Sequence, residues 1–243
     1  MQFIDIHSHI LPYMDDGAKD EKMSLEMLRI AESEGITDII VTPHYRQGHY
    51  KGERKDVDQV LAKMRELMKK ENIHINLYPG NEIYYRSELE EKFDSGTLST
   101  MNDTEYVLVE FSPMEDFLYI RSAVEDLLSI GYTPIIAHVE RIQCIEKNVE
   151  HAHTLKRMGC ELQVNAASAL GEVGFWCKRF VHKMLKEQLV DYIGTDAHNV
   201  ENRPPKIKKC AEMLYRKYDI EYVEDILCQN ATKRLLTHKS TFN

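Results

Sequence analysis

The sequence is poor in cysteine, tryptophan and long apolar runs. Its 243 residues include 5 cysteines and a single tryptophan. The cysteines form no CxxC pair, and their odd number leaves one unpaired, so a disulfide framework is not expected. No apolar run approaches the roughly 18 residues of a membrane span. Histidines interrupt the apolar start where a signal peptide needs its apolar stretch, so we expect a cytoplasmic protein without a membrane span.

Positive charge is also scarce. The chain carries 40 acidic and 31 basic side chains, which gives a formal net charge of −9. An acidic surface without a cluster of Lys and Arg argues against nucleic acid or an anionic membrane as the main partner. At the same time, 43% of the residues are hydrophobic, which is ample for a core and excludes a disordered chain.

Glycines divide the chain into a regular alternation of helices and strands. Three charged amphipathic stretches end at Gly35, Gly131 and Gly159, and each is followed at once by a β-rich run. A left-handed residue closes a helix at such positions, and Asn72 can do the same. Residues 57–68 and 207–218 show helical periodicity, and the second stretch is expected to begin at the Pro-Pro pair of residues 204–205.

The predicted strands are short and continuously apolar. They are FIDI, DIIV, INLY, YVLV, PIIA, LQV and YI, in chain order. Such runs alternating with helices indicate a parallel sheet that is buried on both faces. Seven strand-helix units without a linker predict one α/β domain over residues 1–243, built as a closed barrel. A doubly wound open sheet is the alternative.

Nine polar side chains stand at or just beyond the carboxyl ends of these strands. They are His7, His9, Asp16, His44, Glu82, Glu110, His138, Asp196 and His198. In barrel enzymes this is the face that carries the active site, so residues distant in sequence are expected to meet there. Within HxH and DxH, residues two apart on an extended chain also point to the same side.

The nine side chains are five imidazoles and four carboxylates, with no thiolate. Nitrogen and oxygen ligands suit Mn²⁺, Fe²⁺ or Zn²⁺ and argue against an iron–sulfur cluster or a cysteine-type zinc. Nine ligands exceed what one ion of four to six bonds can use. The sequence therefore predicts two or three divalent ions that share a bridging carboxylate.

Three other features of the sequence have a functional and a purely structural explanation. Cys210 and Arg216 match the CX₅R pattern of cysteine phosphatases, but they fall inside a predicted helix whose N–H groups are not free for phosphate. Asn165 ends a strand and either orients a ligand or bonds to the backbone. Phe175 and Trp176 are expected in the core.

Several motifs in order resemble those of the PHP (polymerase and histidinol phosphatase) superfamily. They are DIHSHILPYMDDGA, TPHY, PGNEIYY, VEF, AHVER, QVNAASALG and GTDAHN, and they span essentially the whole chain. The combination most closely resembles the CpsB/CapC-type protein-tyrosine phosphatases of bacterial capsule and exopolysaccharide synthesis. One departure is Tyr13, which replaces the glycine usual in the first loop.

The resemblance implies a distorted (β/α)₇ TIM-like barrel with three divalent ions, most commonly Mn²⁺. Its first ion would be held by His7, His9, Glu82 and Asp196, its second by Glu82, Glu110 and His138, and its third by Asp16, His44 and His198. Glu82 would be the bridge. Arg141 and Arg203 match the arginines that bind phosphate in the family.

The expected reaction is hydrolysis of phosphotyrosine by a hydroxide that bridges metal ions, without a phosphocysteine intermediate. The resemblance implies a phosphotyrosyl protein as substrate, namely the tyrosine-rich tail of a bacterial tyrosine kinase. Two alternatives stay open. One is a PHP phosphatase for a small molecule such as histidinol phosphate, and the other is a non-catalytic scaffold that only binds metal.

Overall fold

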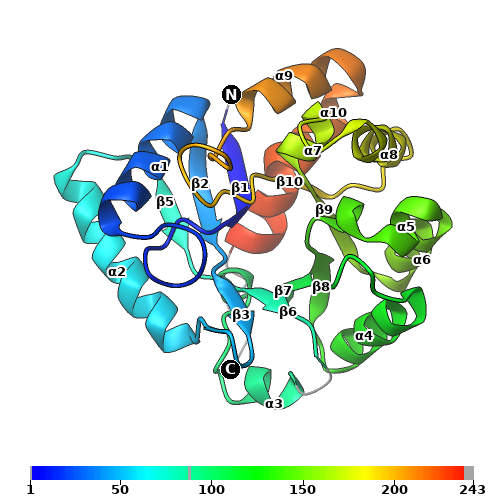
Figure 1. The fold of residues 1–243 in the computed structure, drawn as a ribbon, viewed down its shortest axis with the longest axis horizontal. Helices are drawn as coiled ribbons and strands as arrows, with labels where there is room; N and C mark the ends of the chain where they lie inside the picture. The colour runs from blue at the N-terminus through cyan, green and yellow to red at the C-terminus, as the bar shows by residue number, and fades with distance from the viewer. Residues whose placement is uncertain (1, 87–88, 238–243) are drawn as a thin grey trace.

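Parallel strands form the centre of the molecule and helices surround them, as the computed structural model shows (Figure 1). The structure describes residues 2–86 and 89–237. The strands are β1 (Phe3–Ser8), β2 (Ile36–Val41), β3 (His44–Arg46), β4 (Tyr50–Lys51), β5 (Asn76–Tyr78), β6 (Glu82–Tyr84), β7 (Tyr106–Glu110), β8 (Thr133–Ile136), β9 (Glu161–Asn165) and β10 (Tyr192–Gly194). The α-helices are α1 (Glu21–Glu34), α2 (Arg54–Lys70), α3 (Glu90–Asp94), α4 (Phe117–Ser129), α5 (Gln143–Lys147), α6 (Glu150–Met158), α7 (Ala166–Leu170), α8 (Phe175–Lys186), α9 (Lys208–Lys217) and α10 (Ile220–Glu224).

The strand order is that of a distorted barrel with seven strand positions. One sheet has the order β1-β2-β5 and the other the order β10-β9-β8-β7-β6-β3-β4. All neighbours are parallel except the β3–β4 hairpin. A bridge between Ser8 and Ala197 joins the end of β1 to the segment just after β10, which closes the ring. The predicted (β/α)₇ barrel is thus confirmed, and the open sheet is excluded.

Two of the seven strand positions are interrupted, which the sequence analysis did not foresee. β2 pairs with β5, and their continuations β3 and β6 pair with each other beyond a break. The breaks contain Pro43 and Pro79, which lack the N–H that a central strand must donate. After the break His44 lies in register with Glu82, so two predicted ligands become neighbours across a strand pair.

The helices begin and end largely where the sequence predicts. Gly35 and Gly159 are left-handed C-caps with φ of 89° and 101°, and Asn72 has φ of 54°. On α2 most of the predicted apolar face is buried, and its remaining members, Val60 and Leu67, are partly buried. Helix α9 instead begins at Lys208 and not at the Pro-Pro pair, because the Glu34 carboxylate accepts from the backbone N–H groups of residues 207 and 208.

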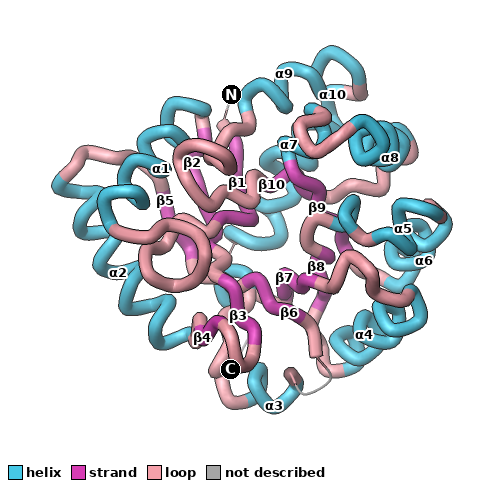
Figure 2. The backbone as a smooth tube through the Cα atoms, viewed as in Figure 1, coloured by secondary structure: helices cyan, strands magenta, loops and turns pink. Residues whose placement is uncertain are grey.

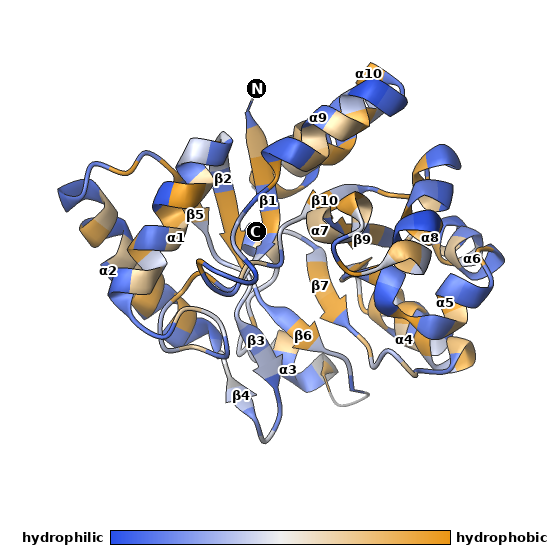
Figure 3. Ribbon diagram, turned by 45° about the horizontal axis from the view of Figure 1, so that its top comes forward, coloured by the Kyte–Doolittle hydropathy of each residue, from blue (hydrophilic) through white to orange (hydrophobic). Residues whose placement is uncertain are grey.

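The core fills the space between the strands and the ring of helices. Buried apolar side chains come from the strands and from the inner faces of α1, α2, α4, α8 and α9. Figure 3 shows the hydrophobic colouring of β1, β2 and β7, and Figure 2 shows the loops that cross the barrel mouth. Among the described residues no helix has the length and apolar character needed to traverse a bilayer.

Phe175 and Trp176 do not belong to the core, so that prediction is wrong. Each is 69% exposed. The buried face of α8 consists of Phe180, Val181, Met184 and Leu185. Trp176 lies one turn before Phe180 on the same helical stripe, but the first turn of α8 leaves that stripe uncovered. Periodicity extends the stripe backwards and does not say where the covering layer ends.

Candidate metal centre

All nine predicted side chains converge at the carboxyl ends of the barrel strands. His7 lies in β1 and His9 directly after it, while Glu110 ends β7. The groups whose ligand atoms lie within 4.8 Å of one another are His9, Asp16, His44 and His198; His7, His9 and Glu82; His7, His138 and Asp196; and His44, Glu82 and Glu110. Together these groups contain every residue of the predicted set. Their convergence follows from the fold, whereas their role as ligands stays a prediction.

One oxygen of Glu82 is at the centre of the cluster. Its Oε2 lies 3.2 Å from His7 Nε2, 3.1 Å from His9 Nε2 and 3.0 Å from His44 Nδ1. The other oxygen, Oε1, is 2.8 Å from His138 Nε2. Glu82 is fully buried, and its Oε2 has no hydrogen-bond partner of good geometry among the described residues. A buried carboxylate ringed by imidazole nitrogens is the position of a bridging ligand.

A chain of hydrogen bonds fixes which nitrogen of His7 faces the centre. Asp196 can only accept, so Asn165 Nδ2 donates to it at 2.8 Å. Gln163 Nε2 then donates to Asn165 Oδ1, which leaves Gln163 Oε1 to accept from His7 Nδ1 at 3.0 Å. A neutral His7 therefore carries its proton on Nδ1 and directs the lone pair of Nε2 toward Glu82.

His9 is fixed in the same way by a different partner. Its Nδ1 donates to Asp15 Oδ2 at 2.7 Å, so its Nε2 also presents a lone pair. The two Nε2 atoms are 3.3 Å apart, and each is 3.6 Å from Asp196 Oδ1. With both imidazoles neutral, these three atoms and Glu82 Oε2 are four lone-pair atoms that face one another and repel, and a cation removes that repulsion. The donor set therefore fits a divalent ion.

The titration behaviour reflects this crowding of like groups. Burial and the Glu82 carboxylate raise the pKa of Glu110 to about 7. Burial and the imidazole of His9 lower the pKa of His198 to about 3. For His7, burial acts to lower the pKa, but the Glu82 and Asp196 carboxylates outweigh it and raise the pKa. Carboxylates and imidazoles thus compete for protons or cations in one small volume.

The other two ligand sets suggested by the family resemblance are also compact. His138 Nε2 lies 2.8 Å from Glu82 and 3.6 Å from Glu110. Asp16 Oδ1 lies 3.6 Å from both His44 Nε2 and His198 Nε2. Asp16 is half exposed, so this set is the one nearest solvent.

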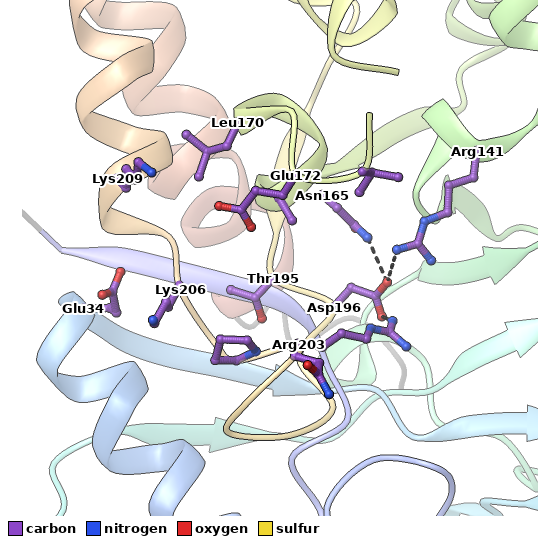
Figure 4. A pocket seen from close by; sticks show the side chains of 14 residues that line it. Glu34, Arg141, Asn165, Leu170, Glu172, Thr195, Asp196, Arg203, Lys206 and Lys209 are labelled. Atoms are coloured by element: carbon purple, nitrogen blue, oxygen red, sulfur yellow. Dashed lines mark hydrogen bonds and ion pairs between the residues drawn. The ribbon is translucent and has the colours of Figure 1, made fainter. Parts of the chain in front are cut away.

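Both predicted phosphate-binding arginines reach the cluster. Arg141 Nη2 lies 3.0 Å from Asp196 Oδ2, and Arg203 Nη2 lies 2.6 Å from Asp196 Oδ1. Both side chains are about a third exposed, and they are among the residues that line a cavity of about 510 Å³ (Figure 4). An anion that enters this cavity would meet two guanidinium groups beside the metal cluster.

Two predicted ligands stand on unusual backbone. His138 has φ of 31° and Asp196 has φ of 53°, both in the left-handed region that disfavours side chains with a Cβ. Hydrogen bonds hold them there, since His138 N donates to Gln163 Oε1 at 2.7 Å and Asp196 N to the His7 carbonyl at 2.8 Å. Tyr13, which replaces the usual loop glycine, likewise has φ of 66°.

Two supporting residues were missed by the sequence analysis. Gln163 joins His7 to His138, and Asp15 accepts from His9, from the His44 N–H at 2.8 Å and from the Gly17 N–H at 2.9 Å. Gln163 could have been found, because it precedes Asn165 by two residues and shares its face of β9. For Asp15 the sequence offers no comparable signal, because it adjoins Asp16 in a loop.

Of the other features weighed in the sequence, Cys210 is not part of the centre, whereas Asn165 contacts it. Cys210 is buried within α9, where burial raises the pKa of its thiol to about 12. A thiol in that state is no nucleophile at neutral pH, which agrees with the prediction that the CX₅R match is accidental. The Asn165 side chain donates to Asp196, a predicted ligand, and not to the backbone, which favours the alternative in which it orients a ligand.

Comparisons with known proteins find similarity along almost the whole chain. The family "Capsular polysaccharide synthesis, CpsB/CapC" matches residues 3–236. Tyrosine-protein phosphatase YwqE of Bacillus subtilis is 35% identical over 239 residues, which cover 98% of this chain and 93% of YwqE. Tyrosine-protein phosphatase CpsB of Streptococcus pneumoniae is 30% identical over 238 residues, which cover 96% and 98% of the two chains.

A solved structure gives the same result in three dimensions. It comes from work on YwqE from Bacillus subtilis and CpsB from Streptococcus pneumoniae, described as unique metal-dependent tyrosine phosphatases. The TM-score is 0.90 at 35% identity, and the alignment covers 96% of this chain and 94% of the other. With a family match over nearly its full length, and relatives of 30% identity or more, the chain belongs to the CpsB/CapC family.

Proposed function

We propose that this chain is a metal-dependent protein-tyrosine phosphatase, a phosphoric monoester hydrolase built as one PHP-type domain over residues 1–243. The observation that carries the proposal is the centre itself. Imidazole lone pairs and carboxylate oxygens are held 3.0–3.6 Å apart around Glu82 and Asp196, next to two arginines. The relatives that share this fold at 30–35% identity are named tyrosine-protein phosphatases.

The proposed cofactor is three divalent ions, with Mn²⁺ as the first choice and Fe²⁺ or Zn²⁺ as alternatives. His7, His9, Glu82 and Asp196 would hold the first ion. Glu82, Glu110 and His138 would hold the second, and Asp16, His44 and His198 the third. Glu82 suits the bridging role because its two buried oxygens face different imidazoles. Nitrogen and oxygen donors are the ligands that these metals accept.

The chain's own residues account for binding and orientation of the substrate. When bound, the divalent ions would supply Lewis-acid stabilisation and lower the pKa of a bound water to near neutrality. Arg141 and Arg203 present planar guanidinium groups that match the oxygens of a phosphate dianion. A tyrosine leaving group has a pKa of about 10, so its departure needs less proton assistance than that of an alkyl alcohol.

The proposed substrate is a phosphotyrosyl protein, and the favoured candidate is the tyrosine-rich tail of a bacterial tyrosine kinase. Membership of a family described by capsular polysaccharide synthesis supports that setting. We place the reaction in the cytoplasm, where such a tail would be exposed. A net charge of −9 around a cationic pocket would direct an anionic group to the centre and not to the rest of the surface.

The test is turnover of a phosphotyrosyl peptide by purified protein, with added Mn²⁺ and after treatment with a chelator. We expect turnover only with metal, and its loss in Glu82→Gln, which keeps the shape of the side chain but removes its charge. Activity that survives complete metal removal would overturn the proposal. Histidinol phosphate turned over with a higher kcat/KM than the peptide would favour the small-molecule alternative, and tight metal binding without turnover would favour the scaffold.

A further inference from the structure

Exposed apolar side chains are concentrated around the mouth of the barrel. Among the described residues, the large apolar side chains that are exposed are Tyr13, Met114, Leu118, Tyr119, Val173, Phe175, Trp176 and Ile220. Those at positions 13, 114, 118 and 119 lie in the connections that follow β1 and β7, and those at positions 173, 175 and 176 lie just after α7, the short helix that follows β9. Apolar side chains on a free surface are a cost in water, and their concentration beside one site marks a contact surface.

The segment Leu170–Trp176 contains exposed apolar side chains and also lines the cavity of the two arginines. Leu170 and Val173 line the same cavity of about 510 Å³ as Arg141 and Arg203 (Figure 4). Phe175 and Trp176 follow Val173 in the sequence after one glycine, and their rings lie 5.3 Å apart in an edge-to-face arrangement. The chain thus places an exposed aromatic pair immediately after a segment that lines the cavity of the two arginines.

Local contacts hold this segment in place. Lys178 Nζ donates to the Leu170 carbonyl at 2.9 Å, and the Glu172 N–H donates to the Ala167 carbonyl at 3.0 Å. Gly171 has φ of 90°, and a Cβ there would lie 2.7 Å from the Lys178 side chain. The aromatic pair is therefore presented by a supported turn, which lowers the entropy lost when a partner binds.

Geometry decides which partner this surface suits. If the proposed function holds, the phosphate of the substrate is bound at the arginines, and the chain on either side of the phosphotyrosine must leave across the rim. Aromatic residues are the side chains that most often dominate the binding energy of such contacts. Neither Phe175 nor Trp176 lines this cavity, so we expect a small phosphate ester bound at the arginines to make no contact with them.

We propose that the segment Leu170–Trp176 is a docking surface for the polypeptide that carries the phosphotyrosine. It selects phosphotyrosyl chains with apolar or aromatic side chains beside the phosphorylated residue. It does not contribute to the hydrolysis of small phosphate monoesters. This inference rests on the proposed function, but it concerns a surface outside the metal centre and can fail while that function stands.

The first test uses kinetics with two substrates and a matched control. The substrates are N-acetyl-phosphotyrosine amide and a phosphotyrosyl peptide with leucine and phenylalanine on both flanks. Phe175→Ala with Trp176→Ala should lower kcat/KM for the peptide about tenfold and change it less than about twofold for the small substrate. The control is Ile220→Ala, which removes a similarly exposed apolar side chain at the start of α10 and should change neither value.

The second test uses fluorescence, which does not depend on turnover. Trp176 is the only tryptophan in the chain, so its emission reports on this surface alone. In chelator-treated protein, the apolar-flanked peptide should shift the emission to shorter wavelength, whereas the same peptide with glycine and serine flanks should not. The shift should persist in Ile220→Ala.

The outcomes separate the two proposals. Turnover of neither substrate with metal present would refute the proposed function, while the fluorescence shift would still establish docking. Equal loss of kcat/KM for both substrates, or none for either, would overturn the docking surface. Sedimentation of wild type and the double variant tests whether a second copy of this chain binds the segment instead. A change of oligomeric state with unchanged peptide kinetics would assign the segment to contact between copies of this chain.

Discussion

Asp15 is predicted to control metal affinity without binding the metal. Its side chain is fully buried, and its two oxygens accept from three donors, namely His9 Nδ1, the His44 N–H and the Gly17 N–H. Asp15→Asn keeps the shape but replaces one accepting oxygen by an NH₂ group. At least one of the three donors then faces another donor, and His9 loses the negative charge that fixes its Nε2 lone pair.

The magnitude follows from these contacts. One buried donor left without a partner costs about 1–3 kcal/mol of stability. Loss of an outer partner of a metal-binding histidine weakens metal affinity by about 10–100-fold. Asp15→Asn should therefore unfold at lower urea concentration in chelator and need at least tenfold more Mn²⁺ for half-maximal binding, measured by equilibrium dialysis with elemental analysis.

The control is the same Asp→Asn substitution at Asp20, five residues after Asp15. Asp20 caps α1 by accepting from the Met23 N–H at 2.8 Å, and asparagine caps helices equally well. Asp20→Asn should leave stability within about 0.5 kcal/mol of wild type and leave metal affinity unchanged. Equal metal affinity for Asp15→Asn and wild type would refute the reasoning, because it would mean that His9 is oriented without this carboxylate.

Three further predictions test other parts of the structure. Arg203→Lys keeps the charge but loses the planar fork, so kcat/KM for a phosphotyrosyl peptide should fall by about tenfold or more while metal content stays unchanged; unaltered kinetics would remove Arg203 from phosphate binding. Cys210→Ala should lower the urea midpoint by a small amount and leave kcat intact, and a complete loss of turnover in folded protein would revive a cysteine nucleophile. Burial, with Lys217 and Lys178 nearby, lowers the pKa of His182, so the folded chain binds fewer protons than the unfolded chain between the two pKa values. The neutral His182 therefore costs the folded state nothing above about pH 6.5, and the folded state loses stability as the pH falls below that value. His182→Gln should reduce the decline of the unfolding free energy between pH 7.5 and 5.5. An identical slope in the variant and wild type would contradict this.

Much of the fold could be predicted because local chemistry and global topology agree. Gly35 and Gly159 end helices where the chain needs left-handed backbone, and the apolar runs after them are the barrel strands. The interruptions of the second and third strand positions were not predicted. Proline marks such breaks, but the pairing of β3 with β6 beyond them depends on contacts between distant segments.

The centre was predictable for a related reason and within a clear limit. A strand end is a position on the barrel rim, so identifying the strands also identified the residues that meet there. Asp15 and Gln163 act through hydrogen bonds whose partners lie in other segments, and these become visible only in three dimensions. The prediction that Phe175 and Trp176 are buried was wrong because the helical period of apolar residues continues past the edge of the layer that covers α8.

The seam between the first and last strands has a consequence for how the protein matures. The ring closes through bonds from the Asp196 and His9 N–H groups to the His7 and Ala197 carbonyls, and through the Thr195 N–H to Asp5. Segments almost 190 positions apart therefore supply adjoining walls of one reaction chamber. During synthesis on the ribosome, a nascent chain would lack this chamber until the segment around Ala197 had emerged. Phosphatase activity would thus be absent from shorter nascent chains.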